Sequence, residues 1–250
     1  MLKKAGYATG GFGKWGLGNQ GKDGAAERQG FDLFYGYYNQ WHAHTYYTHL
    51  FRNSKKVELN GRYTHHAIFD ETIKFIKDNK DKPFFLYLSH YAPHTILNGK
   101  PQLVAKYRKK HPPGKSTRER CYLCQDAALA GDPQNHWAGD HNPPLAAMLE
   151  SIDDGVGQIT AKLKALGLDE NTIVIFSSDN GGERNVTSNA PLHGGKSQLY
   201  EGGIRTPFIA HWPGVIKPGM TAQVGHIIDI SATFRDITGA KYPEEVLGNS

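Results

Sequence analysis

The alternation of apolar, strand-like segments with segments of helical periodicity limits this chain to a small set of folds. Strands rich in β-branched and aromatic residues are expected over residues 7–14, 83–89, 172–177 and 204–212. Helical patterns occur between them. This order is typical of a sheet with helices packed on its faces, so the sequence predicts the α/β class.

Three helices are predicted from apolar spacing and from their end signals. The first covers residues 65–80, and the second carries an apolar residue every three or four positions from Leu145 to Leu166. This second helix is expected to pack into the core and to end at Gly167. Near the C-terminus a short helix is predicted with Asp229 as its N-cap and Gly239 as its stop.

The composition fits one large globular domain, or one domain with a small second lobe. The 250 residues are 38% hydrophobic, with 29 glycines and 13 prolines. No apolar run approaches the roughly 18 residues that span a bilayer, so no transmembrane segment is predicted. The net charge of +5 is mostly solvated surface, and no nucleic-acid partner is expected. From about residue 100 to 144 the periodicity is lost, which predicts an inserted loop.

Polar side chains follow three of the predicted strands. Lys14 follows the first strand, His90 and His94 follow the second, and Asp179-Asn180 follows the third. In an open α/β sheet, ligands bind outside the carboxyl ends of the strands. We therefore expect these side chains to face one crevice.

Each of these signals has two interpretations when it is taken alone. Asp179 and Asn180 offer the hard oxygens that Ca²⁺ or Mg²⁺ requires, but they also form an ordinary Asp-Asn-Gly turn. Lys14 and Lys196 lie in glycine-rich segments where an ammonium group could hold a tetrahedral anion. Either lysine could equally be a surface residue.

Taken together, the segments resemble one family. The sequences GYATGGFGKWGLG, QGFDLFYGY, FFLYLSHYAPH, TIVIFSSDNGG and HGGKSQLYEGGIRTPFIAHWPG occur in this order over nearly the whole chain apart from the predicted insert. In this they are similar to the type I sulfatases, the arylsulfatase-like family. The resemblance implies an alkaline-phosphatase-like fold, a bound Ca²⁺ (or Mg²⁺), and hydrolysis of sulfate esters by a formylglycine made from Cys or Ser in a C/S-x-P-S/A-R motif.

The same resemblance implies roles for individual residues. Asp179 and Asn180 match the metal-binding pair, and Lys14 and Lys196 match the lysines that hold the sulfate oxygens. His94 matches the histidine that binds the sulfate or assists the leaving oxygen. The implied partner is a sulfated small molecule or glycan, and the implied location of the parent protein is periplasmic, secreted or lysosomal.

One family histidine is replaced in this chain. The family pattern is GKWHLG, whereas Gly16 stands at the histidine position here. The segment QWHAHTYY offers His42 and His44, and sulfatase-like sequences with GKWGLG often carry a similar HAH. His44 is therefore the candidate substitute, and the alternative is a surface-loop histidine.

The family nucleophile has no counterpart in these residues. Neither Cys121 nor Cys124 lies in a C/S-x-P-S/A-R sequence, and no serine does. The family's Asp pair after the first strand is also missing, because Asp153-Asp154 lies inside the predicted second helix. We expect a partial sulfatase catalytic domain over residues 1–250, a central fragment whose sheet is incomplete at both ends, without the nucleophile segment and the C-terminal subdomain.

The resemblance therefore predicts that the parent is a sulfuric ester hydrolase, and that this chain alone is inactive. Two alternatives remain open at the level of sequence. One is a phosphodiesterase or phosphonate hydrolase of the same superfamily. The other is a non-catalytic protein that binds sulfated glycans, since a site without its nucleophile binds but does not turn over.

Overall fold

The computed structural model describes residues 1–39, 42, 45–110, 142–184 and 186–242. The chain divides into two compact units, which are treated separately below. Unit 1 comprises Met1–His90 and Lys217–Ser250, and unit 2 comprises Tyr91–Ile216. Three residues discussed above, His44, Cys121 and Cys124, lie outside the described residues.

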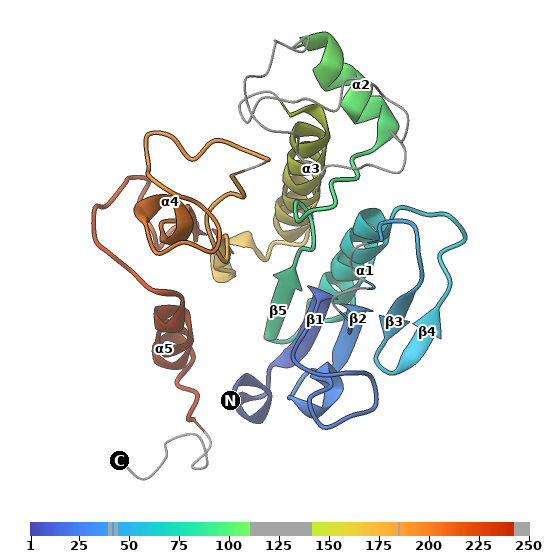
Figure 1. Cartoon of the computed structure of the whole chain (residues 1–250). Helices are drawn as coiled ribbons and strands as arrows, with labels where there is room; N and C mark the ends of the chain where they lie inside the picture. The colour runs from blue at the N-terminus through green and yellow to red at the C-terminus, as the bar shows by residue number, and fades with distance from the viewer. Residues whose placement is uncertain (40–41, 43–44, 111–141, 185, 243–250) are drawn as a thin grey trace. The chain divides into compact units, whose positions relative to one another are not determined.

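Unit 1 is built on a five-stranded mixed sheet in the order β4-β3-β2-β1-β5 (Figure 1). Its strands are β1 (Ala8–Lys14), β2 (Leu33–Tyr37), β3 (Leu50–Arg52), β4 (Lys55–Val57) and β5 (Phe84–Ser89). Strand β1 lies between β2 and β5 and is parallel to both. The β3–β4 hairpin adds antiparallel strands beside β2. A central parallel core with an antiparallel edge is a common α/β arrangement.

Helices contact both faces of this sheet. On one face, Phe12 of β1 lies edge to face with Phe75 of helix α1 (Thr64–Asp78), with ring centroids 5.6 Å apart. Successive side chains of a strand point to opposite faces. Phe85 of β5, which is paired with Thr9 rather than with Phe12, points to the other face. There it contacts Phe234 of helix α5 (Ile227–Thr238) at 5.6 Å. The predicted sheet with helices on both faces is confirmed.

The loop after β1 is fixed by a small aromatic cluster. Two short 3₁₀ helices, η1 (Leu2–Ala5) and η2 (Ala26–Arg28), flank β1 in the sequence. Ala26 of η2 packs with Phe34 and Tyr38 in a buried cluster, against which Trp15 and Phe31 are partly buried. The indole of Trp15 donates a hydrogen bond to the Gly24 carbonyl at 2.7 Å. These contacts determine how the chain leaves β1.

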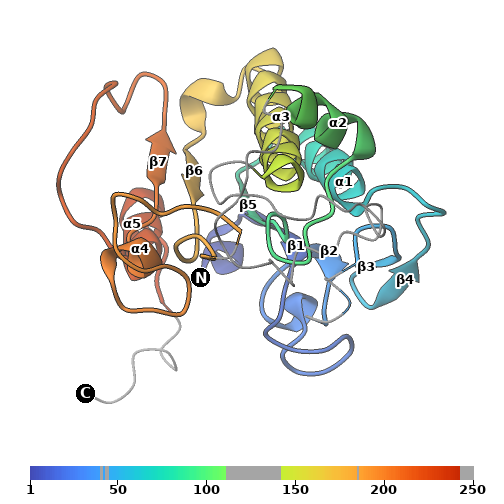
Figure 2. The same cartoon turned by 45° about the horizontal axis from the view of Figure 1, so that its top comes forward.

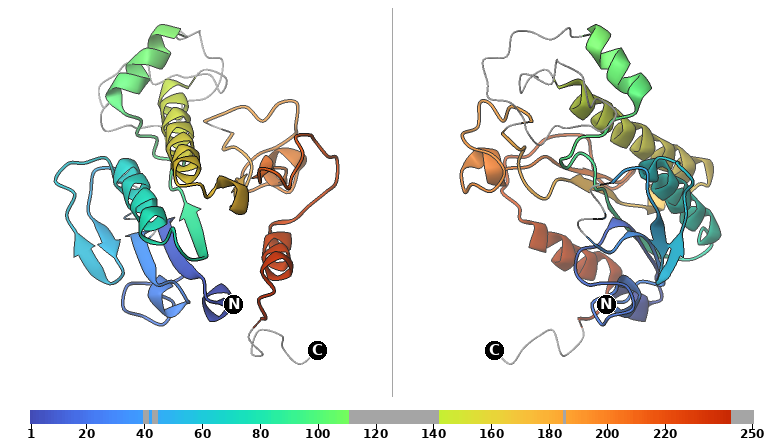
Figure 3. Two further views of the ribbon diagram at one scale, coloured as in Figure 1. Left: turned by 180° about the vertical axis from the view of Figure 1, so that it is seen from behind. Right: turned by 45° about the vertical axis from the view of Figure 1, so that its right-hand side comes forward.

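Unit 2 combines two long helices with a two-stranded antiparallel sheet. Its elements are α2 (Pro101–Lys110), α3 (Pro143–Ala165), the 3₁₀ helix η5 (Asp169–Asn171), β6 (Val174–Ser177), α4 (Glu201–Ile204) and β7 (Phe208–His211). Helices α2 and α3 lie against one another (Figure 3), joined by a 2.6 Å ion pair between Lys106 and Glu150. Strands β6 and β7 run side by side (Figure 2).

Most predicted elements are present, with three differences. The predicted second helix is α3, and Gly167 follows it in the left-handed conformation with φ 69°. The prediction of Asp229 as N-cap was wrong: His226 is the N-cap of α5, and the Asp229 carboxylate accepts from the His226 backbone N–H at 2.7 Å. The strand predicted over 204–212 begins only at Phe208, because Ile204 ends α4.

The third difference concerns the segment from about residue 100 to 144. The prediction of a loop was wrong for its first ten residues, which form helix α2. Only Val104 of this helix is buried, so its sequence shows little apolar periodicity. Residues 111–141 lie outside the described residues, and their assignment to an insert stays a prediction.

Candidate active site

Lys14 stands where β1 leaves the sheet of unit 1. It is half-buried and is the last residue of β1, in register with Tyr37 of β2. Gly13 has φ 94°, a conformation that side chains rarely adopt, and a Cβ there would lie 1.9 Å from the Ser89 carbonyl oxygen. The strand therefore bends tightly past β5 immediately before Lys14. This places the lysine at the carboxyl edge of the sheet, as the sequence predicted.

His90 lies at the same edge of the sheet, because Gly13 is paired with Ser89. Its ring packs between His65, at 4.8 Å, and Phe69, at 4.9 Å. His90 Nδ1 and His65 Nε2 are buried and have no hydrogen-bond partner among the described residues. Burial lowers the pKa of His90 to about 4 and the pKa of His65 well below its usual value. Both imidazoles are therefore neutral, which agrees with a structural role for His90.

His94 belongs to unit 2, and its ring is oriented by two neighbours. Its Nδ1 faces the Thr95 carbonyl oxygen and lies 3.2 Å from the Tyr91 hydroxyl, which itself donates to the Thr95 carbonyl at 2.8 Å. The Tyr91 ring also stacks on the imidazole. A carbonyl oxygen only accepts, so Nδ1 carries the hydrogen. In the neutral imidazole, Nε2 is consequently the nitrogen without a hydrogen.

Asp179 and Asn180 follow β6 after one intervening residue, Ser178. The Ser177 hydroxyl donates to the Pro207 carbonyl at 3.2 Å, which ties the end of β6 to the chain before β7. The Ser178 hydroxyl donates to the Asn180 carbonyl at 3.0 Å and holds the turn. Asp179 is exposed and Asn180 is half-buried. A carboxylate and an amide oxygen thus stand at the end of the strand.

The glycines after this pair serve close backbone contact. Gly181 donates to the Gly203 carbonyl at 2.8 Å, and a Cβ on Gly181 would lie 1.8 Å from the Gly202 carbonyl oxygen. A Cβ on Gly203 would lie 2.0 Å from the Gln198 carbonyl oxygen. Neither residue has a positive φ. Gly181 and Gly203 are needed because two backbone segments touch here.

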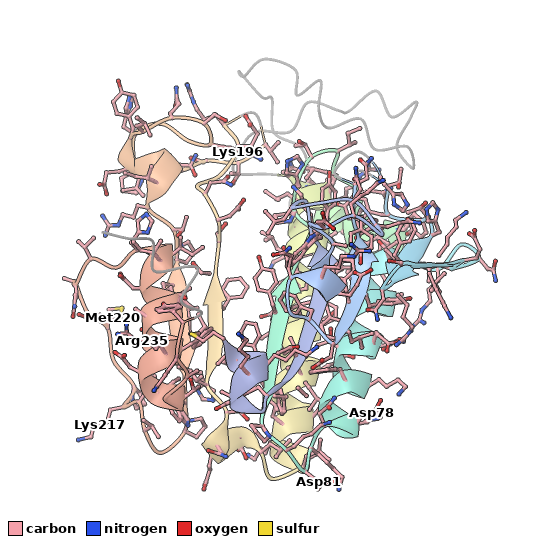
Figure 4. The ribbon with its side chains drawn as sticks, turned by 90° about the horizontal axis from the view of Figure 1, so that it is seen from below. Asp78, Asp81, Lys196, Lys217, Met220 and Arg235 are labelled. Carbon is pink, nitrogen blue, oxygen red and sulfur yellow. The ribbon has the colours of Figure 1, made fainter. Side chains whose placement is uncertain are left out.

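Lys196, which is labelled in Figure 4, lies in a loop of unit 2 that is hydrogen-bonded to this turn. Its backbone N–H donates to the Gly182 carbonyl at 3.1 Å. The same carbonyl accepts from the side chain of Asn189, at 2.9 Å. Lys196 and the Asp179-Asn180 pair therefore belong to one loop cluster. Sequence reasoning did not single out Asn189, although it begins the same segment, NAPLHGGK.

The described structure groups the predicted residues by unit. Lys14 and His90 lie in unit 1, whereas His94, Asp179-Asn180 and Lys196 lie in unit 2. His44 lies outside the described residues. The single crevice expected from the sequence stays a prediction.

The donor atoms at the end of β6 suit a hard cation. Within the described ranges, no group of three or more His, Cys, Asp or Glu side chains could hold a metal ion. Asp179 and Asn180 fit two oxygen positions of a Ca²⁺ site, which takes roughly 6–8 oxygens. Further ligands would have to come from other residues.

No described helix has the length and apolar character that crossing a membrane requires.

Comparison with known proteins supports the resemblance along the chain. The family model described as "Sulfatase" matches residues 1–240. A protein named "Sulfatase" from Formosa agariphila is 38% identical over 199 residues, which cover 75% of this chain and 32% of that protein. An "Arylsulfatase" from Hemicentrotus pulcherrimus is 31% identical over 98% of this chain and 43% of its own length. The chain spans less than half the length of these relatives.

Solved structures give the same fold. The structure of Ps i-CgsB in complex with k-i-k-neocarrahexaose has a TM-score of 0.79 and 28% identity, over 98% of this chain and 53% of that chain. A phosphonate monoester hydrolase from Silicibacter pomeroyi, at 17% identity and a TM-score of 0.58, shares the fold alone. The sulfatase neighbours have the alkaline-phosphatase-like α/β fold, which confirms the predicted fold class. The chain belongs to the sulfatase family.

Proposed function

We propose that this chain is part of the catalytic domain of an enzyme that hydrolyses sulfate esters. The observation that carries the proposal is the loop cluster of unit 2, where hydrogen bonds to the Gly182 carbonyl join the Lys196 loop to the turn that carries Asp179 and Asn180. The nucleophile would come from residues outside this chain, because the 250 residues contain no C/S-x-P-S/A-R sequence.

Lys14 and Lys196 would hold the sulfate group. Their ammonium groups donate charge-assisted hydrogen bonds to the non-bridging oxygens, where negative charge must be stabilised as the S–O bond breaks. The backbone of each lysine is anchored, Lys14 by the end of β1 and Lys196 by the Gly182 carbonyl. A fixed backbone limits the positions that a long side chain can reach, and so favours one mode of binding.

His94 would protonate the leaving alcohol. With Nδ1–H held by the Thr95 carbonyl, the imidazolium presents its second proton on Nε2. As the bond between sulfur and the ester oxygen breaks, that proton passes to the alkoxide and leaves a neutral imidazole. His44, the candidate for the family histidine absent at Gly16, would assist in the same site.

Asp179 and Asn180 would bind Ca²⁺, and Mg²⁺ is the alternative. Their oxygens are the ligand type that either ion prefers. When bound, Ca²⁺ supplies positive charge to the sulfate oxygens, and formylglycine supplies the hydroxyl that attacks sulfur. We further propose a sulfated glycan as substrate. The similarity to Ps i-CgsB, solved with k-i-k-neocarrahexaose, and the 30% identity to an N-acetylgalactosamine-6-sulfatase of Rattus norvegicus support this substrate class.

The test compares 4-nitrophenyl sulfate with 4-nitrophenyl phosphate as substrates of the full-length gene product. Lys196→Ala and His94→Gln should each lower kcat/KM for the sulfate by about 100-fold or more. Lys217→Ala removes an exposed lysine of unit 1 (Figure 4) and should leave kcat/KM unchanged. A preference for the phosphate would instead favour a phosphodiesterase or phosphonate hydrolase of the same fold.

A further inference from the structure

The side-chain amide of Asn189 makes three hydrogen bonds to the loops that carry Gly182 and Lys196. Its Oδ1 accepts from the Gly182 N–H at 3.0 Å, and its Nδ2 donates to the Gly182 carbonyl at 2.9 Å and to the Gly194 carbonyl at 3.2 Å. These partners fix the orientation of the amide. The Gly182 N–H must face the amide oxygen, and the Gly182 and Gly194 carbonyl oxygens must face the amide NH₂. Asn189 thus joins the turn after Asp179-Asn180 to the glycine pair before Lys196.

Two glycines lie in close contact with the Asn189 amide. Gly195 is buried, and a Cβ on it would lie 2.7 Å from both Asn189 Nδ2 and the Gly182 carbonyl oxygen. A Cβ on Gly182 would lie 2.8 Å from Asn189 Oδ1. The two glycines therefore let the amide approach both backbone segments closely. Asn189 is therefore a side chain that connects two loop segments, not one that extends into solvent.

Asn189 acts on Lys196 through a shared hydrogen-bond acceptor. The Gly182 carbonyl accepts from Asn189 Nδ2 and also from the backbone N–H of Lys196. If the amide is lost, the Gly182 carbonyl keeps the bond from the Lys196 N–H, and the Gly194 carbonyl loses a donor. The β6–β7 ladder does not include these bonds. The expected consequence is a shift of the Lys196 loop relative to Asp179-Asn180, with the sheet intact.

We propose that Asn189 is a positioning residue, which sets the placement of the Lys196 ammonium relative to Asp179 and Asn180. The proposal rests on the proposed function, in which Lys196 holds the sulfate. Asn189 itself would touch neither the sulfate nor a metal ion, and would act only through the backbone of Gly182 and Gly194.

Binding of inorganic sulfate to the 250-residue chain, measured by isothermal titration calorimetry, tests this proposal. Asn189→Ala should weaken sulfate binding by about tenfold, the effect of one or two lost hydrogen bonds. Asn189→Asp is nearly isosteric and keeps the acceptor for the Gly182 N–H, but it places an oxygen against two carbonyls, so it should weaken binding at least as much. Ser188→Ala, at the exposed neighbouring residue, should match the wild type.

A double-mutant cycle with Lys196→Ala separates positioning from a general structural role. If Asn189 acts through Lys196, Asn189→Ala should cause no further loss of sulfate affinity in the Lys196→Ala background. Wild-type affinity in both Asn189 variants would overturn the inference, as would an equal loss with and without Lys196. If Lys196→Ala alone leaves sulfate binding unchanged, the proposed role of Lys196 fails first, and the inference fails with it.

Discussion

Two neutral imidazoles in contact make the carboxyl end of β5 sensitive to acid. His90 and His65 lie 4.8 Å apart by ring centroid, and each has a buried nitrogen without a hydrogen-bond partner in the described part of the chain. A proton on either ring would be a buried charge beside a second ring that cannot compensate it. This pair adjoins the strand end that carries Lys14.

The free energy of unfolding should therefore decrease as the pH is lowered from 6.5 to 4. Burial lowers the pKa of His90 from 6.5 to about 4 in the folded chain, so in this range the unfolded chain binds a proton that the folded chain does not. The contribution of the neutral His90 to the free energy of unfolding is fully present above pH 6.5. It is lost as the pH falls, and the free energy of unfolding decreases by up to about 3 kcal/mol. Urea unfolding of wild type and His90→Phe at a series of pH values measures this loss.

The variant keeps a ring of similar shape against Phe69 and removes the titrating group. Its free energy of unfolding should depend less steeply on pH, although His65 still contributes. His211→Gln removes an exposed histidine of unit 2 and serves as the control, with a wild-type pH dependence. Identical curves for wild type and His90→Phe would show that His90 is not held neutral by burial.

At the level of elements, helix α5 depends on the bonds at its first turn. His226 Nδ1 accepts from the Ile228 N–H at 3.3 Å, and the Asp229 carboxylate accepts from the His226 N–H at 2.7 Å. This reciprocal pair is a capping box, which satisfies backbone donors that the helix itself leaves unpaired. No residue of α5 is fully buried.

Asp229→Ala should destabilise α5 by about 1 kcal/mol, because it removes one side of the capping box and an acidic group from the positive end of the helix dipole. Amide hydrogen exchange over residues 227–230 should become several-fold faster. Asp236→Ala also removes an acidic residue of α5, but near its C-terminal end, and should not accelerate this exchange. Equal acceleration in both variants would rule out the capping contribution.

Helix α3 could be predicted from the sequence because its burial leaves a periodic pattern, whereas helix α5 could be predicted from its end signals. Helix α3 buries residues at helical spacing, including Met148 and Ile152, and its pattern was readable over its whole length. Helix α2 buries only Val104 and is held by α3, so its sequence gives almost no signal. The N-cap His226 and the loop-connecting Asn189 depend on single side-chain contacts with backbone groups. Such contacts have no period, and only the three-dimensional structure identifies them.

For the whole molecule, the residues assigned to sulfate binding come from both units. Lys14 belongs to unit 1 and Lys196 to unit 2. Under the proposed function both ammonium groups hold the same anion. Their contributions to binding should then be coupled, since removing one changes what the other can reach.

The 250-residue chain should therefore bind sulfate without hydrolysing sulfate esters. Binding requires Lys14 and Lys196, which this chain contains, whereas turnover requires a nucleophile, and no C/S-x-P-S/A-R sequence is present to supply one. Titration with inorganic sulfate should give a dissociation constant that increases about tenfold or more in Lys14→Ala and in Lys196→Ala, because each loses a charge-assisted hydrogen bond, and that increases with salt as the charges are screened. Incubation with 4-nitrophenyl sulfate should release no more nitrophenol than the Lys196→Ala control. Release above that control would contradict the assignment of the nucleophile to residues outside this chain, whereas additive effects of the two lysine substitutions would contradict a single shared anion.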